Sequence, residues 1–278
     1  MDGKRHSVTG ADGVSIGLLT AGTGPALLLV HGGMGQLERW AAMWPSLTAR
    51  WRVTAMDRRG RGSSGDAAPY SIAAEYADVA AVAARLAEDS GGPVDVFGHS
   101  YGATCLLGAG ALGAPFRRMA LYEPPGPQTA PREWVDRVTV LIGEGRVGRA
   151  MVSFLSEIIG LTGEQIQELK AAPLAYDLFS VVTATLPREA EALTSVDLPG
   201  AARQVTCPAL LLLGAASPAW AADITRELAA ALPAAELVVL PGQGHEAVDS
   251  APELVVSELD RFFGEPDPGV AQGRPDGS

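Results

Sequence analysis

A serine in a glycine-flanked turn is the first residue of the chain whose surroundings indicate chemistry. Ser100 lies in GHSYG, between the apolar strand-like run Val94 to Phe97 and the small-residue helical run Ala103 to Ala111. The flanking glycines let the backbone turn sharply, so that the hydroxyl stands exposed at the helix N-terminus. This strand-turn-helix context is that of a nucleophile elbow; the alternative is a serine that serves only as a helix N-cap.

A serine hydroxyl needs a general base to remove its proton, and one histidine is placed to do so. His245, in PGQGHEAVD, follows the last strand-like run in a glycine-flanked loop. His6 lies in a polar N-terminal segment that we expect to be mobile, and His31 and His99 neighbour other motifs. His245 is therefore the predicted base, and the alternative is a loop histidine held by backbone contacts.

Backbone N–H groups are the predicted donors to the oxyanion that forms when a serine attacks an acyl carbon. Tyr101, the residue after the nucleophile, supplies one donor. HGGMG, His31 to Gly35, directly follows the strand-like run Ala26 to Val30, and its glycines let the N–H of Gly33, or second to it Met34, point into the site. A tight glycine turn of purely structural use is the alternative for this loop.

Short apolar runs alternate with helical runs along most of the chain, a pattern typical of parallel strands joined by helical crossovers. The apolar continuity of the runs fits strands covered on both faces. We therefore predict an α/β fold with a doubly wound, mostly parallel central sheet and an edge hairpin strand over Val14 to Leu19. The central strands are predicted over Ala26 to Val30, Arg52 to Met56, Val94 to Phe97, Met119 to Tyr122, Ala209 to Leu213 and Glu236 to Leu240, and the core helices over Ile72 to Asp89, Ala222 to Ala231 and Pro252 to Phe263.

One stretch breaks the alternation, because residues 124–206 contain only helix-like segments. An all-helical insertion between two core strands is predicted to form a cap over the carboxyl edge of the sheet, where open α/β folds bind ligands. The predicted organisation is a core of residues 1–123 and 207–263, a helical cap of residues 124–206, and a flexible tail of residues 264–278, which is rich in Gly, Pro and Asp. The predicted cap helices are roughly Arg132 to Glu144, Gly148 to Ile159, Gly163 to Ala171, Ala175 to Thr185 and Arg188 to Thr194.

Four motifs together resemble the α/β-hydrolase superfamily. HGG after one strand, DRRGRGSSG from Asp57 after the next, GHSYG, and the terminal GQGH occur in the order of that family over nearly Gly13 to Phe263. The resemblance implies the α/β-hydrolase fold and a serine hydrolase. It also implies that Asp57, Arg58 and Gly60 stabilise a loop beside the site and do not take part in the chemistry.

The acid of the expected catalytic triad departs from the commonest pattern of this family, which places an Asp shortly after the strand Ala209 to Leu213. Ser217 stands there, and Asp223, the nearest carboxylate downstream, falls within a predicted helix. Related hydrolases place the acid after the strand that follows the nucleophile helix, and here that strand ends in Glu123. A carboxylate that reaches the distal nitrogen of His245 can fix its tautomer, whichever loop delivers it. Glu123 is therefore the predicted acid, and pairing with a cap arginine is its alternative.

The predicted activity is hydrolysis of a small-to-medium, largely apolar ester or lactone through an acyl-enzyme on Ser100. Carbon–carbon bond cleavage, thioester hydrolysis, perhydrolysis and biosynthetic cyclisation are compatible with the same residues. An alternative from another class is a non-hydrolytic ligand-binding protein, in which Glu123 points away from His245. The predicted contacts to a small-molecule substrate are Met34, Trp134, Phe154, Tyr176, Phe179 and Trp220. For the aromatic residues among them, packing within the cap is the alternative.

Composition excludes several other classes of function. Apolar residues make up 47% of the 278 residues and charged ones 19%, enough for a sizeable core. The net charge of −11 repels phosphate backbones and anionic lipid, so neither nucleic acid nor a membrane is an expected partner. Without a signal peptide or a run of roughly 18 apolar residues, we expect a cytoplasmic protein. No metal or cofactor is expected, because ligand spacing, the P-loop lysine and the dinucleotide fingerprint are absent from the sequence.

Overall fold

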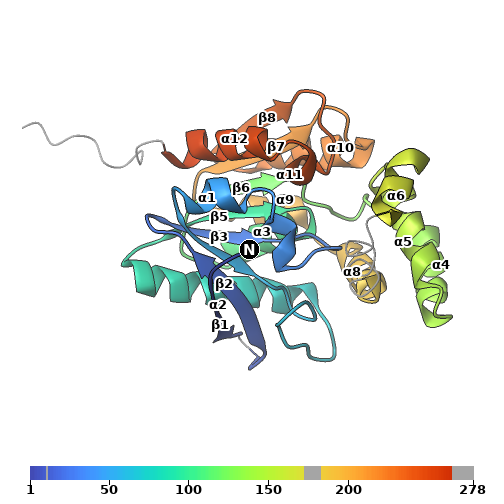
Figure 1. The fold of residues 1–278 in the computed structure, drawn as a ribbon, viewed down its shortest axis with the longest axis horizontal. Coiled ribbons are helices and arrows are strands. Elements are labelled where there is room, and N and C mark those ends of the chain that lie inside the picture. Colours follow the sequence, from blue (N-terminus) through green and yellow to red (C-terminus); the bar gives the residue numbers. More distant parts are fainter. Residues whose placement is uncertain (11, 172–182, 265–278) are drawn as a thin grey trace, which may run out of the picture.

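A mixed sheet of eight strands runs through the computed structural model, which describes residues 1–10, 12–171 and 183–264 (Figure 1). Its strands are β1 (Lys4–Thr9), β2 (Ser15–Ala21), β3 (Ala26–Val30), β4 (Arg52–Met56), β5 (Val94–His99), β6 (Phe116–Tyr122), β7 (Ala209–Gly214) and β8 (Ala235–Leu240). Their order across the sheet is β1-β2-β4-β3-β5-β6-β7-β8. The pairs β1–β2 and β2–β4 are antiparallel, and every pair from β4 to β8 is parallel. The predicted mostly parallel sheet is confirmed.

Helices cover both faces of this sheet, because its central strands are apolar on both sides. In β3, Leu28 and Val30 pack into one hydrophobic cluster, and the alternate residues Leu27 and Leu29 pack into the other. The fold is therefore doubly wound, as predicted. The first cluster contains residues of α2 (Ile72–Ser90), α3 (Tyr101–Ala111), α9 (Leu198–Ala202) and α10 (Ala219–Ala231), and the second contains residues of η1 (Leu37–Trp40), α1 (Trp44–Thr48), α11 (Ala247–Ser250) and α12 (Pro252–Gly264).

The two edges of the sheet differ from the prediction. The segment Lys4–Thr9, expected to be mobile, forms β1 and pairs with β2, so the predicted edge strand Val14 to Leu19 lies one strand further in. At the other end, Glu236 to Leu240 was predicted to be central, but β8 forms the opposite edge. The side chains of β1 are nearly all exposed, so this strand has no apolar signal. The apolar run of β8 marks a strand but does not fix its place in the sheet.

Between β6 and β7, all the regular secondary structure in the described residues is helical, and no strand occurs there. The helices are α4 (Arg132–Gly143), α5 (Val147–Ser153), η2 (Phe154–Ile158), α6 (Gly163–Lys170), α8 (Leu186–Leu193) and α9. Figure 1 shows α4, α5, α6 and α8 grouped beside the sheet, whereas α9 packs against α3 and α10. The predicted helix Ala175 to Thr185 and the predicted tail lie mostly outside the described residues. The division into a core and a cap stays a prediction.

The grouped helices have an apolar cluster of their own. Trp134 and Val138 of α4 pack there with Ile158 of η2 and with Leu186 and Ala190 of α8. Side chains of the same helices line cavities that also contain Ser100, which follows β5. The inserted helices therefore stand over the carboxyl ends of the central strands.

Candidate active site

Ser100 occupies a strained turn between β5 and α3. Its φ of 53° and ψ of −127° are unusual for a residue with a side chain, and among the described residues other than glycine only Glu123 also has a positive φ. A Cβ on Gly98 would lie 2.8 Å from the backbone of Ala103, and one on Gly102 would lie 2.1 Å from the Val30 carbonyl oxygen. Only glycine fits at both positions. The turn places the Ser100 side chain at the N-terminus of α3, beside a cavity.

Glu123 directly follows β6 and contacts His245, which lies in the loop after β8. Its Oε2 is 2.6 Å from Nδ1 of His245, and its Oε1 accepts a hydrogen bond of 2.7 Å from the Gly214 N–H. The Glu123 side chain is 0% exposed and the His245 side chain 2%. A proton on Nδ1 that is held by this carboxylate leaves Nε2 as the free base of the ring.

The loop after β7 carries no carboxylate to His245. Ser217 hydrogen-bonds there only through its backbone N–H to Gly214, and its hydroxyl has no partner among the described residues. Asp223 lies on the exposed side of α10. The last residue of β7, Gly214, instead donates its N–H to Glu123. The structure thus brings Glu123, rather than Asp223, to His245.

Neighbouring rings hold the His245 loop in place. His99 Nε2 lies 2.8 Å from the His245 carbonyl oxygen, and the two ring centroids are 4.7 Å apart. Burial lowers the pKa of His99 well below its usual value, and the electrostatic influence of the neighbouring His245 acts in the same direction. The Tyr122 hydroxyl donates to the Gly244 carbonyl, and the Trp220 ring packs edge-on 5.5 Å from His245. His99 is therefore a neutral support of the loop.

Two arginines orient the glycine loop after β3. Arg58 donates to the carbonyl oxygens of His31 and Gly32, at 3.1 and 3.2 Å, and Arg61 donates to that of Gly33. In a trans peptide the N–H points away from the carbonyl oxygen, so the Gly33 N–H faces away from the Arg58 guanidinium. Gly33 and the first residue of α3, Tyr101, line one cavity together with Ser100. Both predicted oxyanion donors thus lie beside the predicted nucleophile.

These arginines belong to a buried ion-pair network that reaches the inserted helices. Arg58 pairs with Glu75 of α2 and with Glu189 of α8, and Arg61 pairs with the same oxygen of Glu189, each at 2.7 Å. Burial opposes the charge on Arg58, but Glu189 and Glu75 raise its pKa well above the usual value. The Asp57 carboxylate accepts a hydrogen bond of 2.9 Å from the Leu37 N–H and so holds the start of η1, which follows the glycine loop. The resemblance had implied such a supporting role for this motif.

Glu189 was missed by the sequence analysis, although a local signal exists. In LPREAEAL, Glu189 shares a helical face with Leu186, Ala190 and Leu193, and all four residues are buried in α8. A lone carboxylate within an apolar stripe indicates a buried partner. Its arginine partners lie more than 120 residues away in the sequence, so no local pattern could identify them.

Comparison with known proteins decides the family. The model of the alpha/beta hydrolase family matches residues 27–258. The chain belongs to the α/β-hydrolase family. The pimeloyl-[acyl-carrier protein] methyl ester esterase of Nitrosomonas europaea is 30% identical to it over 88% of this chain and 98% of that protein.

Solved structures agree with this assignment. An α/β hydrolase from Sphaerobacter thermophilus is 32% identical, with a TM-score of 0.80 over 93% of this chain and 100% of its own. The enol-lactonase from Burkholderia xenovorans is 22% identical, with a TM-score of 0.78 over 94% of this chain and 100% of its own, and shows the likeness in fold alone. The predicted fold and the prediction of an enzyme of this family are confirmed.

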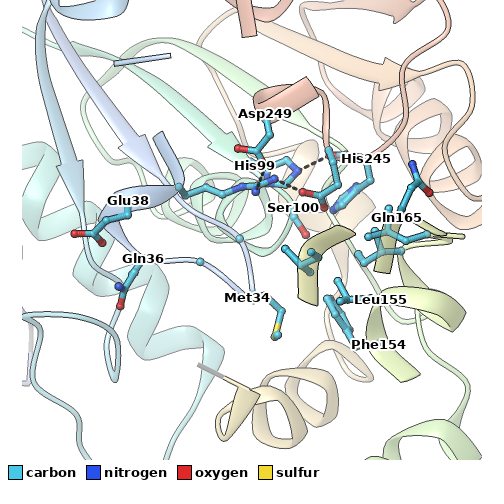
Figure 2. Close-up of a pocket in the computed structure, with 18 of the residues that line it drawn as sticks. Met34, Gln36, Glu38, His99, Ser100, Phe154, Leu155, Gln165, His245 and Asp249 are labelled. Carbon is cyan, nitrogen blue, oxygen red and sulfur yellow. Dashed lines mark hydrogen bonds and ion pairs between the residues drawn. The ribbon is translucent and has the colours of Figure 1, made fainter. Parts of the chain in front are cut away.

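Ser100 of this α/β hydrolase lines two cavities of different size. The large one, of about 550 Å³, is also lined by His245, Met34, Phe154 and Leu155. Figure 2 shows Ser100 and His245 at one wall of this cavity, with Met34, Phe154 and Leu155 across from them. The small one, of about 40 Å³, lacks His245 among its lining residues. Its walls are mostly apolar and include the predicted contacts Trp134, Phe154 and Trp220. The predicted contacts Tyr176 and Phe179 lie outside the described residues.

Most charged residues that line the large cavity of the hydrolase are acidic, and we call this set the acidic rim. Four of its lining residues are carboxylates, Glu38, Glu168, Glu246 and Asp249, and one is a guanidinium, Arg39. Arg39 pairs with both Glu246 and Asp249. Burial works against ionisation of Glu246, but the Arg39 guanidinium lowers its pKa to about 2. The rim therefore carries a net negative charge.

Two further findings concern the described part of the hydrolase. No group of three or more His, Cys, Asp or Glu residues is placed to hold a metal ion there. None of its helices has both the length and the apolar character to cross a bilayer.

Proposed function

We propose that this hydrolase cleaves carboxylic esters through an acyl-enzyme on Ser100, with His245 as general base and Glu123 as the acid of the triad. The observation that carries the proposal is the buried 2.6 Å contact between Glu123 Oε2 and His245 Nδ1, beside a serine in a strained turn. The Glu123 carboxylate can thus orient His245, and His245 and Ser100 line the same cavity. The esterase relative from N. europaea supports the same class of substrate.

The reaction begins when Nε2 of His245 takes the proton of the Ser100 hydroxyl and the serine oxygen attacks the acyl carbon. The Gly33 and Tyr101 N–H groups stabilise the resulting oxyanion, and one such donor contributes about 3–4 kcal/mol to lowering the barrier. The imidazolium then gives its proton to the leaving alcohol oxygen as the carbon–oxygen bond breaks. Water attacks the acyl-enzyme with the help of the same base, and the carboxylic acid departs as Ser100 regains its proton.

The two cavities suit the two halves of an ester. His245 must protonate the leaving oxygen, so the alcohol belongs in the large cavity, which His245 lines. The acyl group then belongs in the small cavity of about 40 Å³. Because this cavity is far smaller than the large one, it suits an acyl group with a short chain. The proposed substrate is a small molecule with a short, largely apolar acyl group.

Other chemistries remain candidates on the same residues. Cleavage of a lactone differs only in that the leaving oxygen stays tethered to the acyl group. Thioester hydrolysis, carbon–carbon bond cleavage, perhydrolysis and cyclisation use the same nucleophile and base. A non-hydrolytic binding protein would leave Glu123 turned away from His245, and the observed contact between them speaks against that alternative.

Active-site labelling with a fluorophosphonate tests the proposal. Wild type should be labelled, Ser100→Ala should not, and Glu123→Gln should be labelled more slowly. Ser217→Ala is a matched control, because its hydroxyl lies in the loop after β7 without a partner among the described residues, and it should be labelled like wild type. An unlabelled wild type, or labelling that persists in Ser100→Ala, would refute the assignment.

A further inference from the structure

Glu189 uses only half of its carboxylate in the ion-pair network. Its Oε1 accepts from Arg58 and from Arg61, each at 2.7 Å. Its Oε2 is buried and has no hydrogen-bond partner among the described residues. The residue is 2% exposed, so bulk water does not satisfy this oxygen. A buried acceptor without a partner is costly and indicates that something else fills the position.

Glu189, which carries the unpartnered oxygen, is one of the residues that line the small cavity beside Ser100. Glu189 lines this cavity together with Ser100, Tyr101 and Gly33. Its Oε2 would lie 3.4 Å from a Cβ placed on Gly33, next to the proposed oxyanion donor. The rest of the lining is mostly apolar, with Trp134 among its walls. An acyl group bound there would meet an apolar pocket with one strong acceptor at its wall.

The charge balance around Glu189 favours a neutral donor. Two guanidiniums, of Arg58 and Arg61, are balanced by two carboxylates, of Glu75 and Glu189. An ammonium group in the cavity would be repelled by both arginines and would lose its hydration without a net opposite charge. A hydroxyl group needs only an acceptor, and the carboxylate oxygen supplies a charge-assisted one.

We propose that the small cavity selects acyl groups that carry a neutral hydrogen-bond donor, above all a hydroxyl group, and that Glu189 Oε2 accepts its hydrogen bond. The inference rests on the proposed esterase function and on the placement of the acyl group in this cavity. Glu189 is then a specificity residue in contact with substrate, in addition to holding the two arginines.

A matched pair of esters tests this in the wild-type enzyme. p-Nitrophenyl 3-hydroxypropanoate differs from p-nitrophenyl butanoate by a hydroxyl in place of the terminal methyl group, so the chains have the same length. Each kcat/KM is divided by the rate constant for hydroxide-catalysed hydrolysis of the same ester, which removes the difference in intrinsic reactivity. We expect the hydroxy ester to be preferred about 10- to 100-fold, the range of a hydrogen bond to a charged group. A ratio near one overturns the inference and leaves an ordered water as the partner of Oε2.

The variant Glu189→Gln tests the residue. An amide keeps one oxygen for the two arginines and turns its NH2 toward the cavity, so a hydroxyl loses its charged acceptor. The preference for the hydroxy ester should fall about fivefold, the difference between charged and neutral hydrogen bonds. A merely structural role would lower both rates together and leave their ratio unchanged, which would overturn the assignment to Glu189.

Glu191→Gln is the matched control. Glu191 lies on the same helix, is exposed, and pairs with Arg132 at the surface, so the ratio should stay at the wild-type value. If Glu189→Gln does not fold, the wild-type ratio still decides the inference. If wild type hydrolyses neither ester and resists fluorophosphonate, the proposed function itself fails. Hydrolysis of both esters without preference refutes the inference alone.

Discussion

Replacement of Glu123 by Gln removes one negative charge and exchanges one acceptor for a donor. In the structure both carboxylate oxygens accept hydrogen bonds, one from the Gly214 N–H and one from His245 Nδ1. The glutamine has a single acceptor oxygen. If that oxygen keeps the Gly214 bond, the amide NH2 faces Nδ1 and drives the ring to the tautomer with its proton on Nε2. That tautomer cannot take the proton of Ser100.

The expected loss in kcat is large. A wrong tautomer combined with the loss of the charge that stabilises the imidazolium costs about 10³- to 10⁴-fold, or about 4–5.5 kcal/mol. KM should change little, because Glu123 lines neither cavity at Ser100. The fold should survive, since the side chain is fully buried and its replacement is isosteric and neutral.

Steady-state hydrolysis of p-nitrophenyl butanoate measures this effect, and thermal unfolding verifies that the variant is folded. Asp223→Asn is the matched control, because Asp223 is an exposed carboxylate near the place where the family more often carries its acid. It should retain wild-type kcat. A folded Glu123→Gln within tenfold of wild type, or a large loss in Asp223→Asn, would show that the acid has been misassigned.

Three other predictions follow from the same structure. Arg58→Lys should lower kcat about 10- to 100-fold with little change in KM, because one ammonium cannot reproduce the guanidinium contacts to the His31 and Gly32 carbonyls that orient the Gly33 N–H, and steady-state kinetics measure this. Gly102→Ala should lower the free energy of unfolding, measured in urea, by about 1–3 kcal/mol, because its Cβ would lie 2.1 Å from a backbone oxygen. Gly92→Ala is the control and should unfold like wild type, because a Cβ there has open space around it. The pKa of Glu246 is lowered from about 4.5 to about 2, so its pairing with Arg39 stabilises the fold above pH 4.5 and is lost as the pH falls toward 2. The stability gap between wild type and Arg39→Gln, followed by urea unfolding across this range, should therefore close on acidification, and a gap that persists at pH 2 would contradict the pairing.

The sequence predicted best the elements whose signals are local. Buried central strands such as β3 read as continuous apolar runs, and the turn at Ser100 is marked by its glycines. The contact of Glu123 with His245 was also expected, because it depends on which strand ends lie together at the edge of a parallel sheet. The roles of these residues stay predictions until the variants are measured.

The features that the sequence did not predict have a common physical cause. β1 is exposed on nearly every side chain and is stabilised by pairing with β2, which no apolar pattern records. The pairing of Glu189 with two arginines joins segments far apart in the sequence. The size of the two cavities is set by how the inserted helices pack over the sheet, and helix-forming patterns do not determine that packing.

The acidic rim affects how readily the product of hydrolysis rebinds. Hydrolysis converts a neutral ester into a carboxylate anion. The four carboxylates of the rim, Glu38, Glu168, Glu246 and Asp249, outnumber the two arginines that pair with them, Arg5 and Arg39. A neutral substrate enters without hindrance from this field, whereas the anionic product is repelled by it. The net negative charge of this lining thus opposes rebinding of the product, and dissolved salt would weaken the effect.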